Sequence, residues 1–156
     1  MTRAAAVRSQ SGVVLLVVLV FVLVTTLGAS SLIQMHQTQT RRDKEAQLLF
    51  VGEQFRRALR AYYNTIPAGA ARTLPPTLED LLEDHRFAVP VQHLRRIYLD
   101  PMTGQADWQL IRQGGGIAGV ASRSDQVPLK KSGFGKDDRQ FEDARSYGQW
   151  RFVIEL

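Results

Sequence analysis

The sequence predicts an α+β fold in which a long N-terminal α-helix packs on a small antiparallel β-sheet of about four strands. No proline interrupts residues 13–66, which leaves room for one long helix. In the second half of that stretch, apolar residues recur at three- and four-residue steps, the spacing of a single helix face. From Leu94 onward the pattern changes to short apolar segments separated by turn residues, which is typical of antiparallel strands.

The first part of the expected helix is apolar on every side. Residues 13–33 contain no charged residue, and residues 13–24 consist only of Val, Leu and Phe. A helix needs about 20 such residues to cross the hydrocarbon core of a membrane, so we expect a transmembrane or assembly helix at 13–33. Arg3 and Arg8 precede it and no acidic residue does, which favours a cytoplasmic N-terminus with the following domain outside the cytoplasm.

The second part of the expected helix, residues 34–65, is amphipathic. Its apolar stripe consists of Leu48, Val51, Phe55, Leu59 and Tyr62, and arginines occupy other faces. The simplest interpretation is one continuous helix of about fifty residues, which would be roughly 75 Å long at about 1.5 Å per residue. Two helices that break near residues 34–40 are the alternative.

A loop and a short helix are expected at residues 66–93. Prolines and a glycine mark the loop. Thr77 has the character of an N-cap, and Glu79 and Asp80 follow in the first turn of a helix that ends near His85. The buried face of that helix would consist of Leu78, Leu81 and Leu82.

The sheet is expected within residues 94–156. Its strands would be residues 95–99, 106–112, 117–122 and 149–156. Residues 100–104 carry the Asp, Pro and Gly that a type I-like turn requires. Residues 114–116 form a second turn, and residues 124–146 are a polar loop. The core that holds the amphipathic helix would contain the aromatic residues Trp108, Trp150 and Phe152.

Three glycines match the G-x-G-x-x-G pattern of phosphate-binding loops: Gly114, Gly116 and Gly119. That pattern binds a dinucleotide only where a strand precedes it and a helix follows it. Here the downstream residues are strand-like and reach Pro128 without helical periodicity. We therefore interpret the pattern as a glycine-rich hairpin turn.

Other candidates for chemistry are weaker. The histidines share no metal-ligand spacing: His36, His85 and His93. No nucleophile with a nearby base is evident, so we do not expect an enzyme. The polar loop at 124–146 contains carboxylates of the type that binds calcium, but they lack the fixed alternation of a dedicated calcium loop, and a solvated surface is favoured. These carboxylates are Asp125, Asp137, Asp138, Glu142 and Asp143.

The net charge of +5 does not indicate nucleic-acid binding. Residues 72–156 contain twelve basic and twelve acidic residues, so the excess lies in Arg3, Arg8 and residues 41–60. Basic residues next to a membrane segment more often orient that segment or contact anionic headgroups than bind DNA. The chain has no cysteine, which excludes disulfides, thiolate metal sites and an acylated cysteine.

One local pattern is more specific. The stretch Arg8-Ser9-Gln10-Ser11-Gly12 leads directly into Val13-Val14-Leu15-Leu16-Val17-Val18-Leu19. It resembles the signal sequence of type IV pilins and type II secretion pseudopilins. The resemblance implies that residues 1–12 are a cytoplasmic leader, that prepilin peptidase cleaves after Gly12, and that Val13 becomes the N-methylated N-terminus. The family usually has glutamate at the fifth mature position, where this chain has Val17.

Later segments also resemble the secretion pseudopilins, namely residues 74–82, 98–104, 107–108 and 150–152. The resemblance implies a pilin-like fold with a periplasmic domain at 34–156, anchored in the inner membrane by a single span. It implies a structural function, which is assembly through the N-terminal helix into a periplasmic pilus-like fibre for protein export. The expected partners are prepilin peptidase, other pseudopilin or pilin subunits and the inner-membrane secretion platform.

Two other interpretations remain open. In one, the first thirty or so residues are a signal peptide with a cleavage site near Gly28-Ala29-Ser30, and the product is an exported periplasmic binding protein. In the other, the chain is never processed and serves as a bitopic inner-membrane scaffold. The missing glutamate at Val17 favours this second alternative.

Overall fold

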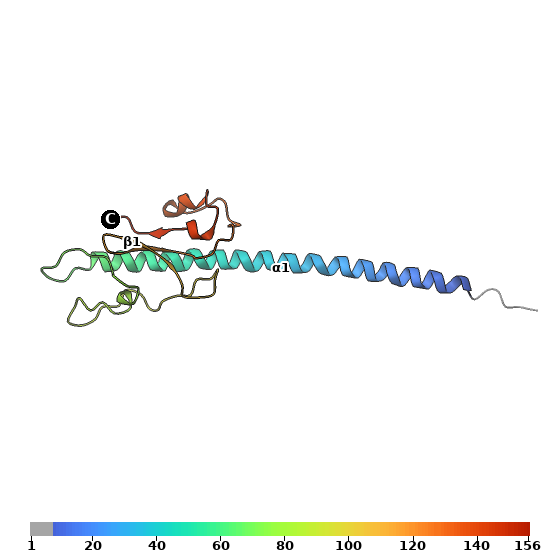
Figure 1. Ribbon diagram of the computed structural model, residues 1–156, viewed down its shortest axis with the longest axis horizontal. Helices are drawn as coiled ribbons and strands as arrows, with labels where there is room; N and C mark the ends of the chain where they lie inside the picture. The colour runs from blue at the N-terminus through green and yellow to red at the C-terminus, as the bar shows by residue number, and fades with distance from the viewer. Residues whose placement is uncertain (1–7) are drawn as a thin grey trace, which may run out of the picture. The chain divides into compact units, whose positions relative to one another are not determined.

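The computed structural model describes the backbone of residues 8–156 and the side chains of residues 12–23 and 37–156. One helix, α1 (Arg8–Asn64), contains 57 residues and corresponds to the predicted continuous helix, so the two-helix alternative is wrong (Figure 1). The chain divides into an N-terminal unit, Met1–Thr40, and a C-terminal unit, Arg41–Leu156. Helix α1 contributes residues to both units.

The C-terminal unit has an α+β fold, as predicted, and its part of α1 packs on a three-stranded antiparallel sheet. The strands, in their spatial order, are β1 (Gln109–Gln113), β2 (Gly116–Ala121) and β3 (Phe152–Val153). The 3-10 helices of this unit are η1 (Glu79–Leu81), η2 (Lys136–Phe141) and η3 (Tyr147–Gln149). Every residue of β2 is buried, so the centre of the sheet is enclosed on both faces.

A two-glycine turn joins β1 to β2. Gly114 and Gly115 have φ values of 58° and 86°, and a two-residue type I′ turn requires positive φ at both positions. The glycine pattern is therefore a hairpin turn, as predicted. Its last member, Gly119, lies in β2, where a Cβ atom would meet the Phe152 carbonyl oxygen at 2.5 Å. These glycines allow the strands to turn and to approach closely.

Residues 95–99, which the structure describes, do not form the expected strand, so that prediction was wrong. Leu94 donates its backbone N–H to the Leu81 carbonyl at 2.8 Å, and the Tyr98 carbonyl accepts the Trp108 indole N–H at 2.8 Å. These bonds tie the segment to a loop and to a side chain instead of a neighbouring strand. The sheet consequently has three strands and not about four.

The short helix expected at residues 78–85 is also only partly formed. It is limited to η1 because the backbone of Asp84 pairs with Val91 in an isolated β-bridge and leaves helical geometry. The predicted N-cap at Thr77 is wrong, because the N-cap position of η1 is Leu78 and no side chain caps it. The backbone N–H and the hydroxyl of Thr77 both donate to the Asp80 carboxylate, at 2.9 and 2.7 Å.

The other strands are shorter than predicted or shifted. The two strands of the hairpin begin and end within three residues of their predicted bounds. The last strand was expected at 149–156 but contains only Phe152 and Val153. The reason is that η3 ends at Gln149 and Trp150 still donates its backbone N–H to the Tyr147 carbonyl, at 3.0 Å.

The apolar stripe of α1 forms the centre of the core, as predicted. Its members are at most 3% exposed: Leu48, Val51, Phe55, Leu59 and Tyr62. The predicted aromatic residues pack against this stripe: Trp108, Trp150 and Phe152. The rings of Phe55 and Trp108 lie 5.2 Å apart, centroid to centroid, in an edge-to-face arrangement. Of the leucines expected under the short helix, Leu78 and Leu81 are buried and Leu82 is half-buried against the core.

Helix α1 approaches β3 most closely at Gly52. A Cβ atom at Gly52 would lie 2.4 Å from three carbons of the Phe152 ring, which is closer than non-bonded carbon atoms approach. Phe152 is itself fully buried, between the helix and the Phe141 ring at 5.2 Å. The absence of a side chain at position 52 therefore allows the helix and the sheet to meet.

We expect Gly52→Ala to lower the free energy of unfolding by about 1–3 kcal/mol, because the added methyl group overpacks a closed core. In an exposed helix the same change would stabilise by about 0.5–1 kcal/mol, so the predicted sign is opposite to that of helix propensity. The measurement is urea unfolding of the full chain in mild detergent, followed by the fluorescence of the two buried tryptophans, Trp108 and Trp150.

Gly135→Ala is the matched control for Gly52→Ala. Gly135 has a φ of −63°, and a Cβ atom there would have no neighbour within 4 Å. The control should change the unfolding free energy by less than about 0.5 kcal/mol. If Gly52→Ala were as neutral as the control, the Phe152 ring would be free to move aside and the close approach would not be constrained.

Candidate functional site

A strip of exposed apolar side chains marks the N-terminal unit. From Val13 to Leu23 every side chain is Val, Leu or Phe, and each is between 48% and 69% exposed within this chain. Soluble proteins rarely leave a contiguous apolar surface of this kind uncovered, because its contact with water is unfavourable. The strip is therefore a candidate surface for contact with lipid or with other apolar helices.

The residues predicted to be processed lie at the start of this strip. Gly12 is exposed, and a Cβ atom there would have no neighbour within 4 Å, so its backbone is accessible in the folded chain. Val13 and Val17 are 63% and 59% exposed. They are four residues apart in α1 and therefore lie on the same face of the helix. The structure thus groups the three predicted positions on one accessible stretch.

In the part of the chain that the structure describes, no helix has both the length and the apolar character needed to cross a membrane. The predicted span at 13–33 includes residues 24–33, whose side chains lie outside the described residues. The same is true of the alternative cleavage site at residues 28–30. His36 and most of the predicted leader, residues 1–7, also lie outside them.

The acidic residues of the 124–146 loop do not converge. Asp138 pairs with Arg56 of α1, its Oδ1 accepting a hydrogen bond at 2.7 Å. The other carboxylates of this loop are exposed: Asp125, Asp137, Glu142 and Asp143. Within the described residues, no group of three or more His, Asp or Glu side chains is arranged to hold a metal ion.

A buried carboxylate that the sequence interpretation missed connects this loop to α1. Glu45 is 4% exposed, and its Oε1 accepts hydrogen bonds from the backbone N–H groups of Leu129 and Lys130, at 2.6 and 3.1 Å. It also accepts the Tyr147 hydroxyl at 2.9 Å. Burial, and then this bond to Glu45, raise the pKa of Tyr147. Glu45 lies three residues before Leu48, so it continues the buried stripe, and that spacing was the available signal.

A second missed cluster is centred on Asp84, whose side chain is fully buried. Its two oxygens accept hydrogen bonds from the Arg86 guanidinium at 2.7 and 2.9 Å, and Oδ2 lies 3.0 Å from His93 Nε2. Burial would raise the pKa of Asp84, but the bonds from Arg86 and His93 outweigh it and lower the pKa to about 2. The carboxylate is therefore ionised at neutral pH.

Arg86 connects this cluster to the C-terminal end of α1. Its NH2 group donates to the carbonyls of Tyr62 and Thr65 at 2.8 and 3.1 Å, and the guanidinium lies 3.6 Å from the centre of the Tyr62 ring. A cation at this position satisfies carbonyls that a helix end leaves free and interacts favourably with the helix dipole. The hydrogen bond that Arg86 donates to Asp84 raises the pKa of Arg86 and outweighs burial, which would lower it.

Asp100 anchors the predicted turn from inside. Its side chain is buried and accepts hydrogen bonds from the Ser122 hydroxyl at 2.6 Å and the Met102 N–H at 2.8 Å. The Asp100 carbonyl accepts the N–H of Gly104 at 2.7 Å, and Gly104 has a φ of 77°. The turn was predicted at these residues, but its connection to the end of β2 was not.

The three buried carboxylates therefore have structural partners. Glu45 and Asp100 are held by hydrogen bonds to residues far along the sequence, and Asp84 is held by the nearby Arg86 and His93. Their role is structural: they hold the compact domain against the second half of α1. The exposed apolar strip at residues 13–23 has no structural role in this domain.

Comparisons with protein-family models, curated proteins and solved structures found no match for this chain.

Proposed function

We propose that this chain is a structural, pseudopilin-like subunit of a type II secretion or type IV pilus machine. The observation that supports the proposal is that the two parts of α1 present different surfaces. Directly after Gly12 the helix presents an exposed, uncharged Val, Leu and Phe surface, and from Leu48 onward the same helix supplies the core of a folded domain. The resemblance of residues 8–19 to a prepilin signal supports the same function.

In the proposed pathway, prepilin peptidase removes residues 1–12 on the cytoplasmic side and Val13 becomes the N-methylated N-terminus. The processed subunit remains in the inner membrane until assembly, with its folded domain in the periplasm. It then leaves the bilayer as its apolar helix packs against those of other subunits on the secretion platform. Lipid tails and Val or Leu side chains are similarly apolar, so helix packing offsets the loss of lipid contacts.

The valine at position 17 affects how such a subunit would be placed in a fibre. In the family, the glutamate at this position is thought to pair with the N-terminal amine of a neighbouring subunit. Val13 and Val17 share one face of α1, so this chain would offer an apolar contact there instead of an ion pair. We propose that its assembly depends on apolar packing along the strip and on contacts of the folded domain.

The N-terminus of the protein from its native membranes tests this proposal. We expect intact mass and terminal sequencing to find N-methylated Val13, and we expect Gly12→Leu to leave the chain uncleaved because the leader that it resembles ends in glycine. Gly28→Leu is the control and should be processed normally. A start near Ser31 would indicate a cleaved signal peptide and an exported binding protein. An intact Met1 would indicate the unprocessed bitopic scaffold, and either result would overturn the proposal.

A further inference from the structure

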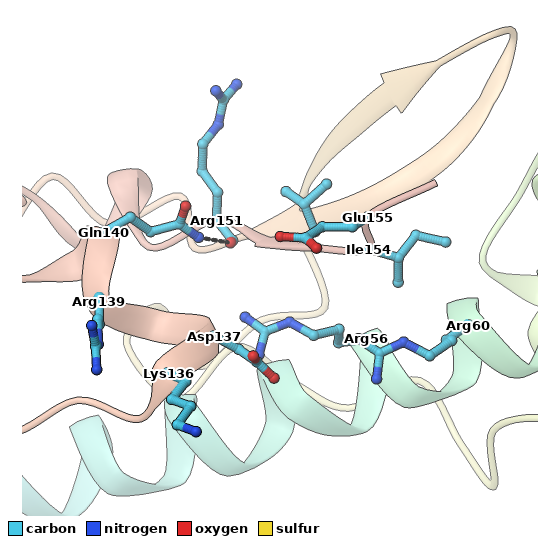
Figure 2. Close-up of a pocket in the computed structure, with 10 residues that line it drawn as sticks. Arg56, Arg60, Lys136, Asp137, Arg139, Gln140, Arg151, Ile154 and Glu155 are labelled. Atoms are coloured by element: carbon cyan, nitrogen blue, oxygen red, sulfur yellow. Dashed lines mark hydrogen bonds between the residues drawn. The ribbon is translucent and has the colours of Figure 1, made fainter.

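A basic pocket of about 460 Å³ lies between α1, η2 and β3 in the C-terminal unit (Figure 2). Its basic lining residues are Arg56, Arg60, Lys136, Arg139 and Arg151. They outnumber the two acidic ones, Asp137 and Glu155. In Figure 2 the Arg151 side chain points away from α1, so the positive charge of the pocket comes mainly from the helix and from η2.

Most of this charge has no partner. Arg56 is buried and its terminal nitrogens bind Glu53 and Asp138, at 2.9 and 2.7 Å. Arg60, Lys136 and Arg139 are exposed, and none forms an ion pair with a residue that the structure describes. Three unpaired cations around one hollow create a local positive potential that attracts an anionic partner.

The same unit presents a complementary acidic turn at η1. Glu79 and Glu83 are exposed there, and Asp80 lies between them with its carboxylate held by Thr77. The partner of Glu83 is the exposed His85, at 3.6 Å. In Figure 1 this turn, coloured yellow-green, lies on the side of α1 opposite the red segments that carry η2 and β3. The acidic turn and the elements η2 and β3 of the basic pocket therefore lie on opposite sides of α1.

We propose that the basic pocket of one copy receives the acidic turn, Glu79–Glu83, of a second copy. Because the basic pocket and the acidic turn are separate patches of one domain, the contact joins unlike surfaces and leaves one of each free on the pair for further copies. Such a contact can repeat from copy to copy, giving a filament or a larger ring, and it is not the self-complementary contact of a closed dimer. Complementary charges of this kind fix the register and the choice of partner more than they supply affinity.

This inference rests on the proposed function, because the apolar helices would bring the copies together. Held in one fibre or one membrane, the domains meet at a high effective concentration, and exposed ion pairs that are weak in solution then become sufficient to select one arrangement. The charged contact would also fix the register between neighbouring copies of a chain that has Val17 in place of glutamate.

Cysteine cross-linking in membranes of the producing cells tests the contact. The chain contains no cysteine, so a pair of introduced cysteines is the only one present. Gln140→Cys places a thiol at the pocket and His85→Cys places one beside the acidic turn, and neither removes a pocket or turn charge. The double variant should give a ladder of dimers, trimers and larger species with a bismaleimide. Each single variant should stop at the dimer at most.

Charge reversal shows whether the ion pairs produce the ladder. In the double-cysteine background, Arg60→Glu and Glu79→Lys should each reduce the ladder about tenfold, and combining them should restore it. Arg145→Glu is the control, because Arg145 is exposed and outside the pocket, and the ladder should not change.

Three results would overturn the inference. They are the absence of a ladder, a ladder that is insensitive to both reversals, and cross-links to a different protein instead of to a second copy. A ladder that persists after Arg60→Glu, together with loss of binding to anionic vesicles, would assign the pocket to lipid headgroups. Intact mass of the same samples separates the two proposals, because chains that start at Val13 without a ladder retain the proposed function and lose only this contact.

Discussion

Replacing Phe55 with alanine is expected to lower the free energy of unfolding by about 3–5 kcal/mol, the cost of removing a buried aromatic ring and leaving a cavity. Phe55 is fully buried at the centre of the α1 stripe, and its ring contacts Trp108 at 5.2 Å and Tyr98 at 6.2 Å. Because these neighbours come from a segment that is held by other hydrogen bonds, the cavity cannot collapse easily. Urea unfolding with tryptophan fluorescence measures the loss.

The same helix provides a matched control for this substitution. Phe50 is 60% exposed, so Phe50→Ala should change stability by less than about 0.5 kcal/mol in the isolated subunit. If both variants lost the same free energy, the face of α1 that forms the core would have been assigned incorrectly. A loss confined to Phe50→Ala would reverse the assignment of the two faces.

Asp84→Ala is expected to cost about 3–5 kcal/mol, because removing one partner of a buried ion pair leaves the other charge uncompensated. The guanidinium of Arg86 would retain the carbonyls of Tyr62 and Thr65 and the Thr73 hydroxyl but no negative charge, and His93 would lose its bond to Asp84. The neighbouring Glu83→Ala serves as control, since the Glu83 side chain is 70% exposed. That variant should remain within about 0.5 kcal/mol of the parent chain.

The cost of Asp84→Ala should also depend on pH in a defined direction. The pKa of Asp84 is lowered from 3.8 to about 2 in the folded chain, so its ionisation stabilises the fold above pH 3.8 and loses this effect as the pH falls towards 2. The difference between parent and variant should therefore shrink by about 2 kcal/mol between pH 5 and pH 2. A difference that stays constant over this range would mean that the ionised carboxylate is not the source of the stability.

The features predicted correctly from the sequence depend on local patterns. The stripe from Leu48 to Tyr62 follows from helical spacing alone, and the turn at Gly114 follows from the need for positive φ in a two-residue hairpin. The aromatic core residues Trp108, Trp150 and Phe152 were identified because they alternate with polar neighbours. In each case the physical cause lies within a few residues of the position concerned.

The errors concern residues whose hydrogen-bond partners a local pattern does not identify. Residues 95–99 have the composition of a strand, but the indole of Trp108 and the carbonyl of Leu81 take the hydrogen bonds that a neighbouring strand would have used. Glu45 and Asp84 were not predicted to be buried, because a carboxylate is buried favourably only where hydrogen-bond donors satisfy it, and those donors do not follow from local spacing. Glu45 finds those donors 84 to 102 residues away, beyond the reach of any local pattern.

The closeness of Gly52 to Phe152 has a consequence for the order in which the protein folds. The ring that covers the middle of the α1 stripe belongs to β3, and the hydroxyl that reaches Glu45 comes from a residue 102 positions later. Domains dominated by such distant contacts fold slowly, since the chain must close a long loop before those contacts stabilise it. The apolar stripe of α1 therefore stays uncovered until β3 packs on it. Over that interval the incomplete domain would be open to aggregation, chaperone binding and proteolysis.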